Sequence, residues 1–396
     1  MQLKSGLAEV FGTELTKGHK YTFHHGSKVA VFTWHGCQLT LEGSADAYTS
    51  KETPMNYYLN LHGCLEKMRN EAAIQLSKGP IVLVCGPTDV GKTTLCRILL
   101  NYAVRRGHTS MFVDLDVGQG SIGIPGVVGL HSIEVPASVE SGFSQVAPLL
   151  YHFGSTSPGT NLNLYEHQIK RCANAVKSKF EVDPKAKYSG VFINTCGWTT
   201  GGGLKALKSA AEFLEVDVVL VIDQEKLYNE LERELPKFVK IVFTPKSGGV
   251  VTRSKEFRSE QRDARIREYF YGIGLKGSKV TQFYPHSFDV PFQLMKIYKV
   301  GAPSIPDSCM PIGMIADDNQ TKLVPVSPGM VLLHHMLSLT FSTDKNDALE
   351  SNIQGFVCVT GVDMEKQTIK VLSPRPKPLP TDCIFLLSDV QFMDSH

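Results

Sequence analysis

The sequence carries no strong excess of charge of either sign. Among its 396 residues, 41 are Lys or Arg and 39 are Asp or Glu, so the formal net charge at pH 7 is +2. Proteins that coat nucleic acids regardless of sequence are strongly basic, and this balance excludes that class while leaving room for a local basic groove. Hydrophobic residues make up 42% and charged residues 20% of the chain, which is typical of a folded protein and excludes a disordered one.

Paired cysteines and long apolar runs are also missing. The nine cysteines are scattered and never spaced as C-x-x-C, which argues against a disulfide framework or a zinc site and is typical of a reducing compartment. The N-terminus, Met1-Gln-Leu-Lys-Ser-Gly, has no apolar signal-peptide core, and runs such as Val218–Ile222 are far too short to cross a bilayer. We therefore expect a cytosolic or nuclear protein without a membrane partner; no basic cluster that resembles a nuclear import signal separates the two compartments.

A chain of this length is too long for one hydrophobic core of average size, and its pattern of apolar and polar residues changes twice. In residues 1–73, short alternating runs precede a helical pattern at Tyr57–Leu76, which predicts an N-terminal β domain and a linking helix. In residues 74–285, solid apolar strands alternate with amphipathic helices, the pattern of a mainly parallel sheet covered on both faces. Residues 286–396 return to short strands and turns. The predicted fold class is α/β, with a central domain flanked by N-terminal and C-terminal small β domains.

Individual elements follow from the same patterns. The strands predicted at the N-terminus are Tyr21–Phe23, Val29–Trp34 and Gln38–Leu41. Those of the central domain are Ile81–Cys85, Ser110–Asp116, Val191–Thr195, Asp217–Asp223 and Ile241–Thr244, and its helices are Thr93–Arg106, Tyr165–Phe180, Leu204–Leu214 and Glu225–Leu235. The C-terminal strands are Leu294–Val300, Thr321–Val326, Gly355–Thr360, Thr368–Leu372 and Ile384–Leu387. The proline-rich segment Ser373–Pro380 is predicted to be a stiff surface connector.

One segment matches a phosphate-binding loop. Gly86-Pro-Thr-Asp-Val-Gly-Lys-Thr93 fits G-x-x-x-x-G-K-[ST], with a predicted strand before it and a helix after it. The glycines let the backbone curl so that its N–H groups converge on phosphate, and the helix N-terminus adds partial positive charge. Lys92 is expected to bridge the β- and γ-phosphates of ATP, and Thr93 to offer its hydroxyl to Mg²⁺. The predicted ATP-binding residues are Gly86, Pro87, Thr88, Asp89, Val90, Gly91, Lys92, Thr93 and Thr94.

The next predicted strand ends in an acidic residue, Asp116. Because the carboxyl ends of parallel strands share one edge with the P-loop, Asp116 should face the γ-phosphate. There it can hold Mg²⁺ or accept the proton of an attacking hydroxyl, whereas Asp114 lies deeper and is expected to serve structure. Val117 follows where motor-type ATPases place a water-activating glutamate, and no N-K-x-D guanine-reading motif is found. Transfer to an acceptor hydroxyl is therefore favoured.

Several motifs together resemble the eukaryotic polyribonucleotide 5′-hydroxyl-kinases. They are Gly86–Thr94, Asp114-Leu-Asp-Val-Gly-Gln-Gly120, Gly154-Ser-Thr-Ser-Pro-Gly159, Asn194-Thr-Cys-Gly-Trp198, Lys246-Ser-Gly-Gly-Val-Val251 and Tyr298-Lys-Val-Gly-Ala-Pro303. The likeness covers nearly the whole chain and is closest to the kinase subunit of the mRNA cleavage and polyadenylation factor and of the tRNA splicing endonuclease complex. It implies ATP- and Mg²⁺-dependent phosphorylation of RNA 5′-hydroxyl ends in mRNA 3′-end processing and tRNA splicing, in the nucleus, with subunits of both complexes as partners.

The resemblance also implies roles for single residues. Asp116 would be the general base on the RNA 5′-hydroxyl, and Arg253 and Arg258 would belong to a lid over the transferring phosphoryl. Gln119, Thr156 and Trp198 would hold the terminal nucleotide, Trp198 by stacking on its base. Family members carry a further stretch ahead of the position of Met1, so part of the N-terminal domain and of the adenine pocket is expected outside this sequence, with Lys51 a weak candidate within it. One family member binds ATP without turning it over, but here the lysine, the base and the arginines are all present, which favours activity.

Two of these assignments also have a plain structural alternative. Trp198 directly follows a strand and precedes the glycine-rich Thr199–Gly203, which favours an exposed ring suited to stacking on any base; the alternative is a tryptophan packed in the core. Arg253 and Arg258 lie next to the glycines of Lys246–Gly249, where closure would bring them onto the γ-phosphate. A solvated helix with i,i+4 ion pairs is the alternative, and the better interpretation for Arg262, Arg265 and Arg267.

Three functions are thus distinguished. The first is an RNA 5′-hydroxyl kinase with Asp116 as base and with Lys92, Mg²⁺ and the lid arginines stabilising the phosphoryl group. The second is an ATP-binding scaffold in which nucleotide only rigidifies a surface for partners, and it can coexist with catalysis. The third is a small-molecule kinase, which would need a closed acceptor pocket. The sequence does not separate RNA from DNA, nor identify the physiological RNA or the partner surface.

Overall fold

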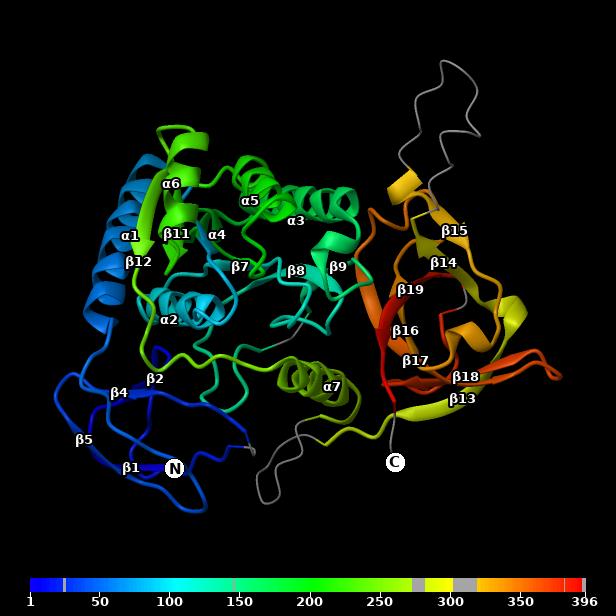
Figure 1. The fold of residues 1–396 in the computed structure, drawn as a ribbon, viewed down its shortest axis with the longest axis horizontal. Coiled ribbons are helices and arrows are strands. Elements are labelled where there is room, and N and C mark those ends of the chain that lie inside the picture. The colour runs from blue at the N-terminus through cyan, green and yellow to red at the C-terminus, as the bar shows by residue number, and fades with distance from the viewer. Residues whose placement is uncertain (24–25, 145–146, 273–281, 302–318, 381, 394–396) are drawn as a thin grey trace.

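The computed structural model describes residues 1–23, 26–144, 147–272, 282–301, 319–380 and 382–393. A helix-covered sheet forms the largest part of the molecule, with the N-terminal strands below it and the C-terminal β domain beside it in the view of Figure 1. The predicted fold class is confirmed by this arrangement. Within the described ranges, no helix is both long enough and apolar enough to cross a membrane.

The central sheet has the order β12-β11-β6-β10-β7-β8-β9. Its strands are β6 (Ile81–Cys85), β7 (Met111–Asp114), β8 (Val127–Ser132), β9 (Leu149–His152), β10 (Val191–Asn194), β11 (Val218–Ile222) and β12 (Lys240–Thr244). The five predicted strands are confirmed and run parallel. Strands β8 and β9 were not predicted; β8 pairs antiparallel with β7, and β9 pairs antiparallel with β8. Antiparallel neighbours need no crossover helix, so the strand–helix alternation that identified the other strands is absent there.

Helices cover both faces of this sheet. On one face, α1 (Met55–Gln75), α2 (Lys92–Arg105) and α7 (Lys255–Tyr271) share a core cluster, and on the other α3 (Leu162–Val182), α5 (Gly202–Phe213) and α6 (Glu225–Glu234) share a second. In β6, Val82 and Val84 point into the first cluster, and Ile81, Leu83 and Cys85 into the second. Because alternate side chains are buried on opposite faces, the strand is apolar throughout, as predicted. The short helix α4 (Pro184–Ser189) was not predicted.

The N-terminal domain is built from short strands. They are β1 (Gln2–Gly6), β2 (Glu9–Val10), β3 (Thr13–Glu14), β4 (Val31–Phe32) and β5 (Cys37–Thr40). The strand predicted at Tyr21–Phe23 is wrong: Tyr21 is buried, its N–H donates to the Met1 carbonyl at 2.8 Å, and its hydroxyl accepts from the Thr16 N–H. The alternating pattern here arises from the one buried ring of Tyr21, and residues 21–23 do not pair with a neighbouring strand.

The C-terminal domain is a seven-stranded sheet of order β13-β18-β17-β16-β19-β14-β15. Its strands are β13 (His286–Pro291), β14 (Lys296–Val300), β15 (Leu323–Pro325), β16 (His335–Thr340), β17 (Ile353–Asp363), β18 (Thr368–Ser373) and β19 (Ile384–Gln391). The five predicted strands are confirmed, while β13 and β16 were missed. Pro291 ends β13 and argues against a strand in a sequence pattern. As expected, residues 374–378 form an exposed connector between β18 and β19.

The central and C-terminal sheets meet at β9. The Gly154 carbonyl accepts hydrogen bonds from the Asp389 N–H at 2.7 Å and the Ser388 hydroxyl at 3.0 Å. His152 is buried at this junction, with Nδ1 2.9 Å from the Ser338 Oγ. The junction fixes the loop after β9, which carries Thr156, relative to the C-terminal domain.

Burial of His152 predicts a pH effect on stability. Burial lowers the pKa of His152 to about 4 in the folded protein, against about 6.5 in an unfolded chain. Between these values the unfolded chain binds a proton that the folded protein does not, so the free energy of unfolding should fall as the pH drops from about 6.5 towards 4. Melting temperatures across this range should decline less steeply in His152→Gln than in the wild type. Equal slopes for both would exclude His152 as a source of the decline.

Candidate active site

The P-loop lies between β6 and α2, at the carboxyl edge of the parallel strands. Gly91 precedes α2 with a φ of 90°, a left-handed conformation that favours glycine and turns the chain into the helix. The N–H groups of the first helical turn lack acceptors within the helix and are available to phosphate. The Lys92 ammonium donates to the Gly86 carbonyl at 3.0 Å and the Pro87 carbonyl at 2.7 Å, and burial lowers its pKa. Lys92 is thus folded back over its own loop.

Asp116 follows β7 at the same edge. Burial, together with the neighbouring Asp114 carboxylate, raises the pKa of Asp116 to about 6, although the Gly118 N–H donates to its Oδ1 at 2.9 Å and opposes the shift. A carboxylate with a pKa in this range can accept a proton near neutral pH, which suits a general base. The sequence thus pointed to a carboxylate whose pKa is raised by its surroundings in the fold.

Asp114 shapes the loop that carries Asp116. One of its carboxylate oxygens accepts the Asp116 N–H at 3.1 Å and the Asn194 side-chain amide at 2.9 Å. The other accepts the Ser121 N–H at 2.9 Å and also the Ser121 hydroxyl. The three bonds from Asp116 and Ser121 close residues 114–121, which we call the base loop, into a compact ring, and the bond from Asn194 ties this loop to β10. Asp114 thus has the structural role expected of it.

Asn194 is a site residue that sequence reasoning did not single out. It pairs with Asp114 across β10 and β7, and its amide oxygen accepts from the Thr93 hydroxyl at 3.3 Å. Asn194 therefore connects the P-loop hydroxyl to the base loop. The available signal was a polar residue at the end of the solid apolar strand β10.

Both lid arginines reach the P-loop through Asp89. The Arg253 Nε donates to one Asp89 oxygen at 2.8 Å, and an Arg258 amino group donates to the other at 2.6 Å. The Asp89 side chain is only 4% exposed; burial alone would raise its pKa, but the hydrogen bonds from the two arginines lower it to about 2. The sequence analysis counted Asp89 only as part of the phosphate cradle. Its carboxylate instead ties the lid to the cradle.

The expectation of a solvated helix is wrong for two of the remaining arginines of α7. Arg265 donates from Nε to the Gly120 carbonyl at 3.1 Å and from an amino group to the Ser121 carbonyl at 3.0 Å. The Arg267 guanidinium lies 5.6 Å from the centre of the Phe392 ring in the C-terminal domain. Both side chains therefore make tertiary contacts, which i,i+4 spacing alone does not reveal. Arg262 is half-buried.

The residues proposed for the RNA end come together at this edge. Trp198 follows β10, and the adjoining Gly197 packs directly on Thr88 of the P-loop. The Thr156 carbonyl lies against Gly118 of the base loop, 3.1 Å from where a Cβ would stand. Gln119, half-buried, lies one residue further along that loop. The fold thus places Gln119, Thr156 and Trp198 around the loops that hold Lys92 and Asp116.

The expected exposed loop after Trp198 is only partly present. Thr199 is buried and Gly202 already begins α5, so Gly202 and Gly203 are helical and Thr200 and Gly201 form the exposed part of the segment. Trp198 is half-buried, with its ring packed on Gly202, where an added Cβ would stand 2.6 Å from the ring edge. Behind it lies a narrow cavity lined by residues of α3 and α5, among them Tyr165 and Ala206. The indole is therefore held in position, with part of its surface accessible.

The site fits ATP with Mg²⁺ by its chemistry. The N-terminus of α2 and the buried Lys92 supply positive charge for phosphates. The Asp116 carboxylate and the hydroxyl of Thr93, whose side chain is exposed at the start of α2, are oxygen groups of the kind that Mg²⁺ binds. In the part of the chain that the structure describes, no three His, Cys, Asp or Glu residues cluster as a metal site. Mg²⁺ on a nucleotide needs none, because it keeps waters and phosphate oxygens as ligands.

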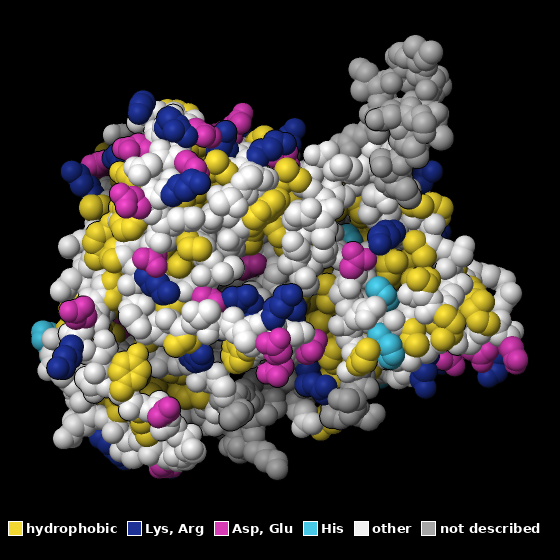
Figure 2. Space-filling model, viewed as in Figure 1, with side chains coloured by type: hydrophobic (Ala, Val, Ile, Leu, Met, Phe, Trp, Pro, Cys, Tyr) yellow, Lys and Arg dark blue, Asp and Glu magenta, His cyan; other side chains and the backbone are white. Residues whose placement is uncertain are grey.

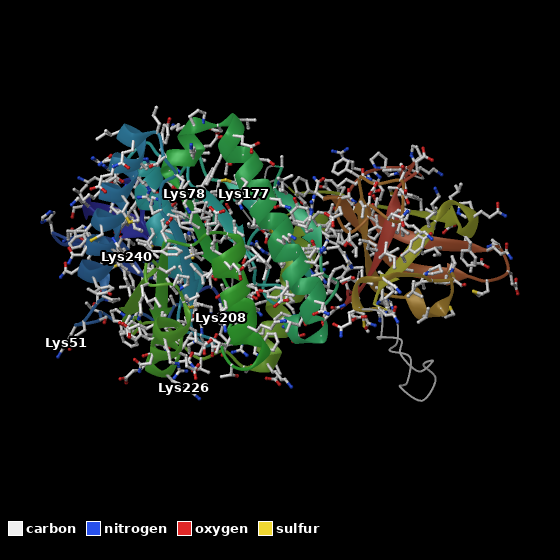
Figure 3. All side chains as sticks on the ribbon, turned by 90° about the horizontal axis from the view of Figure 1, so that it is seen from above. Lys51, Lys78, Lys177, Lys208, Lys226 and Lys240 are labelled. Carbon is white, nitrogen blue, oxygen red and sulfur yellow. The ribbon has the colours of Figure 1, made fainter. Side chains whose placement is uncertain are left out.

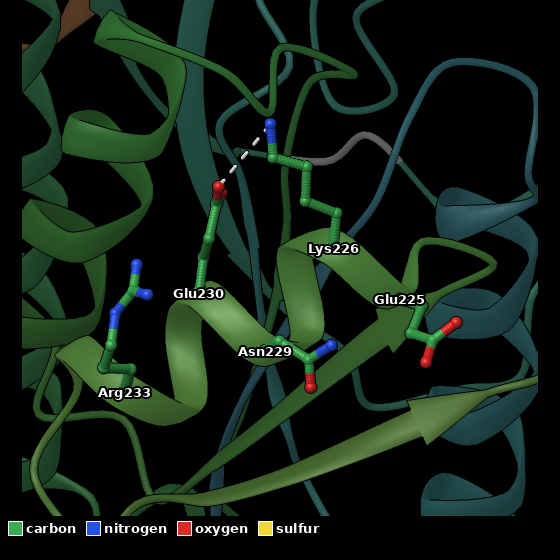
Figure 4. A pocket seen from close by; sticks show the side chains of 5 residues that line it. All are labelled: Glu225, Lys226, Asn229, Glu230 and Arg233. Atoms are coloured by element: carbon green, nitrogen blue, oxygen red, sulfur yellow. Dashed lines mark ion pairs between the residues drawn. The ribbon is translucent and has the colours of Figure 1, made fainter.

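Other surfaces carry less specific chemistry. An open hollow of about 460 Å³ lies over the outer face of α6, lined by Glu225, Lys226, Asn229, Glu230 and Arg233 (Figure 4). Lys226 pairs with Glu230 at 3.8 Å, the spacing of an ordinary surface ion pair. None of the lining residues belongs to the P-loop or the base loop, so this hollow is separate from the phosphate site.

The lysines of the central domain do not form a bare cationic strip. Figure 3 labels Lys51, Lys78, Lys177, Lys208, Lys226 and Lys240, which lie on the side away from the C-terminal domain. Lys78 and Lys177 both pair with Glu215, and Lys208 pairs with Glu234. The opposite charges are also interspersed over the face in Figure 2. Lys51, considered above for adenine, is exposed ahead of α1.

A P-loop with a buried lysine, and a carboxylate that follows β7 at the same edge of the sheet, define the class of P-loop phosphotransferases. Comparison with known families agrees: residues 86–272 match the mRNA cleavage and polyadenylation factor CLP1 P-loop, residues 283–394 the pre-mRNA cleavage complex II protein Clp1, and residues 1–72 the N-terminal beta-sandwich domain of polyadenylation factor. The chain belongs to the Clp1 family of polyribonucleotide 5′-hydroxyl-kinases, within the mRNA cleavage and polyadenylation machinery.

The relatives support this at full length. Proteins named polyribonucleotide 5′-hydroxyl-kinase Clp1 from Gallus gallus and Homo sapiens are 58% and 56% identical over 396 residues, covering 100% of this chain and 92% of theirs. A solved structure described as an extended interface between Pcf11p and Clp1p, with the basis of ATP loss in a point mutant, is 26% identical with a TM-score of 0.83, covering 99% of this chain and 93% of that one. A wild-type Clp1p–Pcf11p complex, 24% identical over 100% of this chain and 93% of that one, has the same fold, with a TM-score of 0.78. The predicted family and enzyme class are confirmed.

Proposed function

We propose that this kinase transfers the γ-phosphate of ATP to the 5′-hydroxyl of RNA, with Asp116 as general base. The observation that carries the proposal is the Asp116 carboxylate, whose pKa is raised to about 6 at the edge of the sheet that also holds the P-loop. The RNA 5′ oxygen attacks the γ-phosphorus and its proton passes to Asp116, while the bond to the β-phosphate oxygen breaks and ADP leaves. Bound Mg²⁺, held by Thr93 and Asp116, would neutralise charge on the phosphate oxygens.

The positive groups of the site act on the transferring phosphoryl. Lys92 exchanges its bonds to the Gly86 and Pro87 carbonyls for bonds to the β- and γ-phosphates. Arg253 and Arg258 exchange Asp89 for the equatorial oxygens of the transferring group, where charge spreads in the transition state. Each of these cations already contacts the P-loop, Lys92 through two of its carbonyls and both arginines through Asp89.

The RNA end is bound by the residues around the base loop. Gln119 and Thr156 contact the terminal nucleotide and its phosphate, and Trp198 stacks on the terminal base. Trp198 suits this role because it follows β10 at the edge that holds the P-loop, with its ring steadied by Gly202. Stacking accepts any base, which fits an enzyme that acts on RNA ends of varied sequence.

Trp198→Ala is expected to weaken binding of a short 5′-hydroxyl RNA by ~1–3 kcal/mol, roughly 5- to 150-fold. The loss should be similar for each terminal base, and the affinity for ATP should not change. Because the ring is half-buried, a modest fall in melting temperature should accompany it. Trp34→Ala is the matched control, since Trp34 is 43% exposed in the N-terminal domain. A large loss of stability with unchanged RNA affinity would assign Trp198 to the core.

We further propose that the kinase works in the nucleus with subunits of the mRNA cleavage and polyadenylation factor and of the tRNA splicing endonuclease complex. The family assignment and the relatives solved as Clp1p–Pcf11p complexes support the first partner. The second rests on the motif resemblance alone. Copurification of each complex with the full chain from nuclear extract tests the two partners separately.

The activity is tested with γ-labelled ATP and a short 5′-hydroxyl RNA. We expect label at the RNA 5′ end, none on the same RNA that already carries a 5′-phosphate, and a dependence on Mg²⁺. The same assay with 5′-hydroxyl DNA and with free nucleosides separates the acceptor classes. Labelled nucleoside with no labelled RNA would indicate a small-molecule kinase, and ATP binding without transfer to any acceptor would indicate a scaffold.

A further inference from the structure

Helix α7 contacts the P-loop, the base loop and the C-terminal domain. It lies between the central sheet and the C-terminal strands (Figure 1). Just ahead of its N-terminus and in its first turn, Arg253 and Arg258 bind Asp89 of the P-loop. At its C-terminal end, Phe270 is fully buried and stacks on Phe392, 6.0 Å between ring centres.

This C-terminal end of α7 is a fixed anchor. Ile266 and Phe270 have no exposed surface, and the Tyr269 hydroxyl accepts the Phe356 N–H of β17 at 2.9 Å. Groups near this end of the helix therefore have defined positions relative to the C-terminal domain. Arg265, one residue before Ile266, is one of them.

Arg265 holds the far side of the base loop. Its Nε and one amino group bind the consecutive carbonyls of Gly120 and Ser121 at 3.1 and 3.0 Å, while the other amino group binds Glu268 at 2.6 Å. Glu268 lies one turn further along α7 and fixes the plane of the guanidinium. The planar guanidinium presents its donors in a fixed fork, which suits two neighbouring carbonyls and a carboxylate at once.

The base loop is thus held from two directions. From within, Asp114 binds the N–H groups of Asp116 and Ser121. From outside, Arg265 binds the carbonyl of the Gly120–Ser121 peptide and the carbonyl of the peptide that follows it. Gly120 has a φ of 55° and little free space around it, so this turn is tightly defined. Displacement of the turn would displace Gln119 and Asp116, which precede it.

We infer that Arg265 is a positioning residue, which ties the base loop to α7 and thereby holds Asp116 and Gln119 at the RNA 5′ end. The inference rests on the proposed role of Asp116. It also makes α7 a single rigid connection between the lid arginines, which act on the phosphoryl group, and the base, which acts on the hydroxyl. The two halves of the reaction are then aligned by one helix.

Arg265→Met is expected to lower kcat by about 10²-fold, the usual effect of misplacing a reacting group by about 1 Å. KM for ATP should stay within about twofold, because the hydrogen bonds of Arg265 go to Gly120, Ser121 and Glu268, and the loss is one of alignment. The kcat of Arg265→Lys should lie between those of the wild type and Arg265→Met, since one ammonium replaces only part of the guanidinium fork. Glu268→Gln should lower kcat less than Arg265→Met, because the guanidinium remains but loses its charged partner.

The matched control is Arg267→Met, which removes the same charge from the same helix. Arg267 packs on the Phe392 ring, so its loss should lower the melting temperature and leave kcat per folded molecule unchanged. Hydrogen exchange of the peptide covering 117–123 gives a readout without catalysis: it should quicken in Arg265→Met and not in Arg267→Met. If Arg265→Met does not fold, Arg265→Lys and Glu268→Gln carry the same comparison.

Three results would overturn the inference: a kcat of Arg265→Met within about twofold of the wild type, an equal fall of kcat in Arg267→Met, or unchanged exchange of residues 117–123. A wild type that transfers no phosphate to RNA refutes the proposed function instead. In that case the exchange experiment still decides whether Arg265 holds the loop. The two failures are therefore distinguishable.

Discussion

Asp116→Asn is expected to lower kcat by about 10²–10⁴-fold, the range of a lost general base, while ATP still binds. An amide accepts a proton far less readily than a carboxylate, but it preserves the size of the side chain and can keep the Gly118 N–H bond to Oδ1. The affinity for ATP should change little, because Lys92 and the α2 N-terminus remain. Single-turnover transfer to 5′-hydroxyl RNA and a titration with ATP measure the two quantities separately.

Lys92→Ala provides the contrast to this variant. It removes the cation that reaches the β- and γ-phosphates, so both ATP binding and transfer should be lost. An Asp116→Asn enzyme that turns over normally would remove Asp116 as base. One that loses ATP affinity as completely as Lys92→Ala would assign Asp116 to the metal and nucleotide alone.

Arg258→Ala is expected to lower kcat by about 10³-fold and to raise KM for ATP only slightly. Arginines that stabilise a transferring phosphoryl group contribute ~10³–10⁵ in rate, and Arg253 remains in this variant to supply part of the effect. Because such an interaction forms mainly in the transition state, it appears in kcat rather than in KM. Steady-state kinetics with ATP as the varied substrate test the pattern.

Asp89→Asn separates the two states of the lid arginines. In the structure both arginines bind the Asp89 carboxylate, which holds them on the P-loop but also occupies them. The amide keeps the size of the side chain and removes its charge, so the arginines are freed while Arg258 itself is retained. Loss of activity in Arg258→Ala with activity kept in Asp89→Asn would assign Arg258 to the phosphoryl group. Equal losses in both would mean that the ion pair itself is required, and a change confined to KM would return Arg258 to a binding role.

Local patterns were sufficient for the elements that carry the P-loop. Strand β6, the motif Gly86–Thr93 and helix α2 follow one another without interruption, and each is recognised from residues within a few positions. The same holds for β7 and β10, whose solid apolar runs end in Asp114 and Asn194. Strands β8 and β9 were not predicted, because antiparallel neighbours need no crossover helix between them and so leave no alternation of strand and helix in the sequence.

Contacts between distant residues were beyond such patterns. Asp89 lies 164 positions from Arg253, and Gly120 lies 145 positions from Arg265. The arginines of α7 have similar neighbours in the sequence and similar spacing. Nothing local therefore distinguishes an arginine that binds the P-loop from one that binds the base loop or the C-terminal domain. The half-burial of Trp198 likewise depends on where α5 begins.

The fold class, the phosphate cradle and the carboxylate after β7 follow from the sequence, because each depends on residues close together in the chain. The binding of Arg253 and Arg258 to Asp89, and of Arg265 to the base loop, became visible in the folded structure alone. Burial and ion pairing depend on which surfaces meet once the chain has folded. Those contacts join segments more than a hundred residues apart, and no local pattern encodes them.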